Sequence, residues 1–369
     1  MSVVAYSTLA SSDLRESAYR DHAVDLIKGW ACLLMVVAHV PFPDARWLSW
    51  TTMGSVLFFS STGMNLWGLV ARQRGDYLRI AANGLFLIFA GFADNYVLGT
   101  MGQSDVFQSA GMAMIAMLAL HWMLPRTWTW LFPLPFLIHY ANQHFFFWKI
   151  SAGGVSSFFL TPGLFPLLPW LSFYLLGAHL KRYPERRMRW GIGLGALAAC
   201  GVAVAATGWR LDKFWMSPEY WFLGLAYTAL LLDGLRVWLA RCRRPSLAEL
   251  RYWGANSLVF YILHGFVIRL LEIWLPGGWL LLVAALSLTA VLMRAGLWLQ
   301  HWARTQSPWA ILAGCGGVSA AVLGMEAVYL HAYYARTFLS FGLTLSFLAA
   351  YPAFKLLSQR LPALGVQSN

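Results

Sequence analysis

Long apolar stretches recur along almost the whole chain, and short basic gaps separate them. Many of these stretches reach 18 residues, which is close to the length that an α-helix needs to cross the hydrocarbon core of a bilayer. Hydrophobic residues make up 59% of the chain and charged residues only 11%. A β-barrel would alternate polar and apolar residues with a period of two, and this pattern is not seen. The sequence therefore predicts an all-α, polytopic membrane protein.

We expect about 10–12 spanning helices that form one transmembrane helical bundle. They are expected at about 23–40, 50–70, 78–97, from after Gln108 to Pro125, 127–148, 164–180, 189–208, 219–239, 253–273, 277–299, 307–330 and 337–357. A single membrane domain would cover 21–360, between cytoplasmic tails at 1–20 and 361–369.

The chain has a net charge of +12, and the positions of its basic residues indicate the membrane topology. Arginine and lysine gather in alternate gaps, after the second, sixth and eighth helices and more weakly after the fourth and tenth. Positive loops stay on the cytoplasmic side, so both termini are predicted to be cytoplasmic. The same distribution leaves no basic patch for nucleic acid, and the lipid bilayer is the expected partner.

The first apolar helix carries three ionisable residues on one face, Asp25, Lys28 and His39. On an ideal helix Lys28 and His39 differ by about 20° in azimuth, and Asp25 lies within about 40° of His39. Ionisable groups inside a bilayer are costly, so such a face predicts a functional site. His39 could act as a general base near neutral pH or simply hydrogen-bond another helix. Asp25 and Lys28 could form an interfacial ion pair, or Lys28 could contact a phosphate.

A second polar face is predicted on the ninth helix, where Ser257 and His264 lie about 20° apart and Tyr261 is close to both. We expect this face to meet the polar face of the first helix around a cavity. Alternatively, these side chains only hydrogen-bond neighbouring helices.

Two further groups of polar residues have two interpretations each. Arg72, Arg74 and Arg79 could anchor the chain at the cytoplasmic surface or bind a phosphate-rich cosubstrate. Four residues near the outer ends of the third and fourth helices could serve the site, by binding a hydroxylated substrate or by orienting His39, or be merely solvated: Asp94, Asn95, Asp105 and Gln108. The histidines of 139–144 resemble metal-ligand spacing only loosely, and no metal site is predicted.

Five segments, in this order, resemble bacterial transmembrane acyltransferases of the acyltransferase-3 and heparan-α-glucosaminide N-acetyltransferase-like group. They are VDLIKGWACLLMVVAHV, which ends in the histidine of the first helix, LFFSSTGMNL, DVFQSAGMAMI, PGLFPLLPWLSFYLLGAHLKR and YWGANSLVFYILHGFVI. In the first segment Lys28 stands where the family usually has arginine. Lysine keeps the charge but loses the bidentate geometry of a guanidinium.

The resemblance implies transfer of an acyl group, usually acetyl, from cytoplasmic acetyl-CoA to a hydroxyl or amine of a glycan or other acceptor across the membrane. We expect His39 to act as general base, with Asp25 and His264 as further catalytic residues. The expected donor-binding residues are Lys28, Arg72, Arg74 and Arg79. The expected acceptor-binding residues are Asn65, Asp94, Asn95, Asp105, Gln108, Ser257 and Tyr261.

The same resemblance places the chain in a bacterial inner membrane, with acyl-CoA as cosubstrate, no tightly bound cofactor, and homo-oligomers as an option. A transporter or flippase is the competing interpretation, because it would use the same intramembrane polar residues. The chain shows no repeat of the transporter type.

Overall fold

The computed structural model describes residues 21–42, 45–72, 77–98, 104–144, 158–160, 165–241, 247–329 and 333–358. These residues form 13 α-helices and two short 3-10 helices, and they contain no strand. The α-helices are α2 (His22–His39), α3 (Met53–Arg72), α4 (Tyr77–Leu98), α5 (Val106–Met123), α6 (Leu134–His144), α7 (Leu167–Arg182), α8 (Arg186–Thr207), α9 (Pro218–Arg241), α10 (Ala248–Ala255), α11 (Ser257–Glu272), α12 (Trp279–Thr305), α13 (Pro308–Tyr329) and α14 (Tyr333–Ser358). The 3-10 helices are η1 (Ala45–Thr52) and η2 (Trp128–Leu131). The predicted all-α class is confirmed.

Five helices are long and apolar enough to cross a membrane, namely α2, α5, α8, α9 and α12. The pair α10 and α11 would add a sixth span if its two bent parts cross together. In the described part of the chain this count is lower than the 10–12 spans expected, partly because some buried helices are short. For example, α7 has 16 residues, fewer than the 20 or so that span a bilayer alone. The architecture is that of a multi-pass helical membrane protein.

Two expected helices are broken. The predicted helix at 253–273 is instead α10 and α11, which meet at an angle of 95° at Asn256. There the Asn256 side chain donates a hydrogen bond of 2.9 Å to the carbonyl of Tyr252, which satisfies the end of α10. The predicted helix at 127–148 is divided into η2 and α6, since Pro133 lies between them and supplies no backbone N–H.

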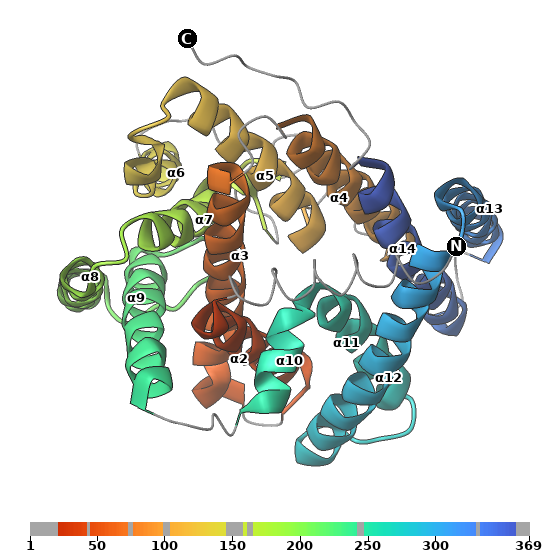
Figure 1. Cartoon of the computed structure of the whole chain (residues 1–369). Coiled ribbons are helices and arrows are strands. Elements are labelled where there is room, and N and C mark those ends of the chain that lie inside the picture. Colours follow the sequence, from red (N-terminus) through yellow and green to blue (C-terminus); the bar gives the residue numbers. More distant parts are fainter. Residues whose placement is uncertain are drawn as a thin grey trace, which may run out of the picture.

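Glycines let the central helices approach closely. A Cβ at Gly29 would lie 1.9 Å from the carbonyl oxygen of Leu250, and a Cβ at Gly254 would lie 1.7 Å from that of Asp25. These contacts hold α10 directly against the first half of α2. Small residues at such crossings allow close van der Waals packing. This packing matters in a bilayer, because the hydrophobic effect does not drive helices together in lipid. Figure 1 shows α2 and α3 inside the bundle, with α8 beside α9 at one edge and α13 beside α14 at the opposite edge.

The basic loops gather at one end of the bundle. Asp21, which caps the start of α2, accepts hydrogen bonds of 2.7 Å from Lys181 and 3.1 Å from Arg236. Burial by itself raises the pKa of the Asp21 carboxyl, but the two cations outweigh it and the net pKa is lowered. The Arg182 guanidinium lies 5.1 Å from the Trp67 ring and donates to the carbonyl of Pro125. The ends of α3, α5, α7 and α9 therefore meet beside the start of α2, as the charge pattern predicts.

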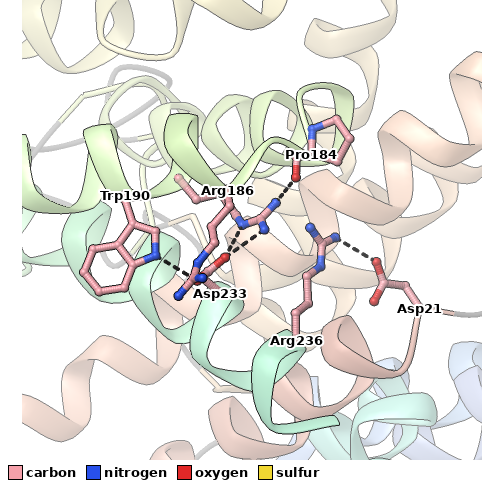
Figure 2. Close-up of polar contacts among 7 residues, drawn as sticks. Asp21, Pro184, Arg186, Trp190, Asp233 and Arg236 are labelled. Carbon is pink, nitrogen blue, oxygen red and sulfur yellow. Dashed lines mark hydrogen bonds and ion pairs between the residues drawn. The ribbon is translucent and has the colours of Figure 1, made fainter. Parts of the chain in front are cut away.

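A buried carboxylate ties α8 to α9 at this same end. Asp233 is 2% exposed and accepts hydrogen bonds from Arg186, Arg189 and the Trp190 indole (Figure 2). Arg189 is itself buried and also donates to the carbonyl of Pro184. Every buried charge in this group has a partner, so removal of one partner would leave an uncompensated charge between α8 and α9.

Candidate functional site

Two histidines meet where the last residue of α2 approaches the middle of α11. The ring centroids of His39 and His264 are 5.3 Å apart, with an interplanar angle of 62°. The predicted meeting of the two polar helix faces is thus confirmed for these two residues. His39 is exposed, whereas His264 is 3% exposed and stacks on Phe260.

Both imidazoles are held in the same tautomer by their own helices. His39 Nδ1 lies 2.7 Å from the carbonyl oxygen of Met35, and His264 Nδ1 lies 2.6 Å from that of Tyr261. A carbonyl oxygen only accepts, so Nδ1 carries the hydrogen in each neutral ring. The Nε2 lone pair is therefore the basic position of both rings, which is the form that a general base requires.

The histidine pair lines a cavity of about 580 Å³. This volume falls within the range of small-molecule binding sites. Tyr261 lines the same cavity, as the polar face predicted for this helix requires. The other walls come from α4, α5, α13 and α14, which bring mostly aromatic, aliphatic and small side chains.

Two charged lining residues were missed by sequence reasoning. Arg269 and Glu272 lie on the last turns of α11 and complete the cavity wall beside the histidines. The sequence did carry a signal for these two residues, because ionisable residues near the end of an apolar helix are candidate site residues. Outside the helices, Lys213 in the loop between α8 and α9 lies close enough for its charge to act on His39. Its Nζ is 5.2 Å from the Phe165 ring, and burial lowers its pKa.

Other predicted residues lie away from this cavity. Asp25 is buried at the opposite end of α2, and a helix rise of 1.5 Å per residue places it about 21 Å along the axis from His39. Lys28 is half-buried in the same half of α2. Ser257 is buried at the first turn of α11, and Asn65 is exposed on α3. None of these four lines the cavity. Asp25, Lys28 and Ser257 share a helix face with a histidine but lie at a different depth.

Three of the predicted acceptor residues form a helix cap. Asp105 accepts a hydrogen bond of 2.8 Å from the Gln108 backbone, and the Gln108 side chain accepts one of 2.9 Å from the Asp105 backbone. Asn95 of α4 donates to the same Gln108 oxygen at 2.9 Å. All three are buried, which contradicts the solvated alternative. They fix the start of α5 against α4, and their predicted contact with an acceptor stays a prediction.

The predicted donor turn is only partly described. Arg79 is half-buried on the first turn of α4. Arg74 and the side chains of Arg72 and Asp94 lie outside the described residues. In the part of the chain that the structure describes, no group of three His, Cys, Asp or Glu side chains could hold a metal ion.

The candidate site is therefore a histidine pair in a cavity that combines a charged wall with apolar walls. Models of protein families, curated proteins and solved structures give no match to this chain.

Proposed function

We propose that the chain is a membrane-bound acyltransferase that moves an acyl group, such as acetyl, from cytoplasmic acyl-CoA to a hydroxyl or amine of a glycan or other acceptor. The observation that carries the proposal is the pair His39 and His264 in the wall of a ligand-sized cavity. The acyltransferase-like segments, which follow one another in the same order as in that group, include both histidines and give the reaction class.

His39 is the better base of the two, because it is exposed to the cavity and its Nδ1 hydrogen is held by a backbone carbonyl. In the proposed reaction its Nε2 takes the proton of the acceptor hydroxyl or amine. The acceptor oxygen or nitrogen then bonds to the thioester carbonyl carbon, and the carbon–sulfur bond breaks. The proton passes from His39 to the departing thiolate, so CoA leaves as the thiol.

Other groups in the cavity wall are suited to stabilise the negative charge that develops during the reaction. The tetrahedral intermediate carries a negative oxygen, and the Arg269 guanidinium and Tyr261 hydroxyl are donors in the same cavity. The nearly buried ring of His264 packs against His39 and holds it in place. It acts in this proposal as a positioning residue.

A route for the donor runs along α4. Arg79 is on its first turn, and the cavity-lining Phe86 lies seven residues further, about 10 Å along the helix. A CoA whose phosphates stay at the basic end of the bundle would extend its pantetheine arm in this direction. Arg79 itself does not line the cavity.

The test is transfer of radiolabelled acetyl from acetyl-CoA to membrane glycans. His39→Ala should lower the rate about 100-fold or more, in the range of general-base contributions. The matched control is His144→Ala, because His144 is an exposed histidine at the end of α6. Equal rates for wild type and His39→Ala would overturn the assignment. Uptake of an intact solute into proteoliposomes without acyl-CoA would favour a transporter instead.

A further inference from the structure

The cavity has two chemically different sides. Its carboxylate, guanidinium, imidazole and phenol side chains all come from α2 and α11: His39, His264, Arg269, Glu272 and Tyr261. The lining residues from α4, α5, α13 and α14 include no charged side chain. A ligand that fits both sides has a polar head and a hydrocarbon chain.

The apolar side is built by regular stripes along three helices. On α4 the lining residues are Phe86, Phe89, Ala90 and Ala93, and α13 and α14 repeat the same i, i+3, i+4, i+7 spacing. The α13 stripe is Leu312, Cys315, Gly316 and Ser319, and the α14 stripe is Leu343, Ser346, Phe347 and Ala350. The later positions of each stripe are mostly small, which leaves the space that a chain would occupy.

The cavity extends to the edge of the molecule. It is lined on α4 by Phe89, which is 69% exposed, and on α13 by Gly316, which is also exposed. Figure 1 places α13 at the margin of the bundle, next to α14. In a multi-pass membrane protein, an opening between apolar helices at this margin would face acyl chains of the bilayer rather than water. Ordered water would require two to four polar partners, and the apolar stripes offer few.

We propose that this cavity binds the hydrocarbon chain of a lipid-linked acceptor, whose polar head lies at the histidine pair. The inference rests on the proposed acyl transfer for the role of acceptor, but binding of the chain does not require turnover. Such an acceptor would reach His39 sideways from the membrane, while the acyl-CoA arrives from the basic end.

The binding test uses purified full-length protein and a photoreactive hexadecyl glucoside with a diazirine in its chain. Label should map to peptides of α4, α13 and α14. Gly316→Phe should reduce labelling at least ten-fold, because its side chain would fill the space beside the stripe. A Cβ at Gly316 meets nothing within 4 Å, so the new side chain starts in open space.

The matched control is Gly317→Phe, since this neighbouring glycine is also exposed, also open around its Cβ, and does not line the cavity. Equal labelling of the two variants would overturn the proposal. Displacement of the label by palmitoyl-CoA but not by unlabelled hexadecyl glucoside would assign the chain to the donor and overturn it too. Displacement by phosphatidylglycerol alone would mean a bulk lipid, with the same consequence.

A second arm separates this inference from the proposed function. Acetyl transfer to hexadecyl glucoside should exceed transfer to methyl glucoside at least ten-fold in wild type, and Gly316→Phe should remove the difference. Labelling of the stripes with no transfer to any acceptor would contradict the acyltransferase assignment alone. Transfer at equal rates to both glucosides, with no labelling of the stripes, would contradict the lipid-linked acceptor alone.

Discussion

At the scale of single residues, Asp233 is notable because its carboxylate has several hydrogen-bond partners although it lies outside the candidate site. Two arginines and an indole donate to its carboxylate, and both Asp233 and Arg189 are buried. Asp233→Ala leaves the Arg189 charge uncompensated, so we expect the free energy of unfolding to fall by about 3–5 kcal/mol. Thermal unfolding of the detergent-purified variant, followed by tryptophan fluorescence, measures the loss.

The control for this prediction is an exposed ion pair. Glu249 and Arg294 also form a salt bridge, but both side chains are more than half exposed, at 55% and 56%. Solvent screens such a pair, so Glu249→Ala should leave the unfolding temperature almost unchanged. Similar unfolding temperatures for the two variants would mean that burial does not decide the contribution of Asp233.

The residues of the site differed in how far the sequence could predict them. His39 and His264 were predictable because each interrupts an apolar run of a predicted membrane helix. Asp25 was predicted to be catalytic because it shares a helix face with His39, but a shared azimuth does not bring two residues to the same depth, and the helix separates them by about 21 Å. Arg269 and Glu272 were not singled out from the sequence. Only the packing of α11 against α2 and α14 brings them to the cavity.

At the scale of helices, α3 and α7 depend on two glycines at one crossing. A Cβ at Gly63 would lie 2.0 Å from the Tyr174 carbonyl oxygen, and a Cβ at Gly177 would lie 1.8 Å from that of Ser60. Gly177→Ala must push the helices apart, and we expect a loss of about 1–3 kcal/mol in the free energy of unfolding. That loss includes the helix-propensity gain of about 1 kcal/mol that alanine brings. Thermal unfolding in detergent measures the net change.

The same substitution on an open helix face should have the opposite sign. Gly201 lies on α8 with nothing within 4 Å of a Cβ, so Gly201→Ala keeps the propensity gain without a clash. Its unfolding temperature should equal or exceed that of wild type. If Gly177→Ala behaved in the same way, the close crossing of α3 and α7 would be wrong.

The helix boundaries were largely predictable, because apolar runs and basic gaps define them. The break between α10 and α11 was not. The apolar pattern continues across Asn256, and this residue has no proline or positive-φ glycine beside it to indicate a stop. The break depends on tertiary contacts, since Gly254 packs against the Asp25 carbonyl and holds α10 flat on α2. Sequence patterns at this position cannot show that contact.

At the scale of the whole molecule, the fold separates a basic end from the end that holds the histidine pair. The start of α2 meets the basic ends of α7 and α9, whereas His39 is the last residue of α2. The predicted orientation, with the positive loops in the cytoplasm, would put the histidine pair toward the outer half of the membrane. A donor from inside and a lipid-borne acceptor would therefore approach the cavity from different directions, without competing for one opening.

This orientation makes a prediction for one helix. α8 begins next to Arg187 at the basic end and ends before Arg210, and both arginines are exposed. In intact cells a membrane-impermeant maleimide should label Arg210→Cys at least ten-fold more than Arg187→Cys, in a background without the four native cysteines. Permeabilising the cells should bring the two variants to similar labelling, which controls for reactivity. The reverse ratio in intact cells would place His39 on the cytoplasmic side. In that case a cytoplasmic donor would reach the histidines directly from its own side, without passing through the helix bundle.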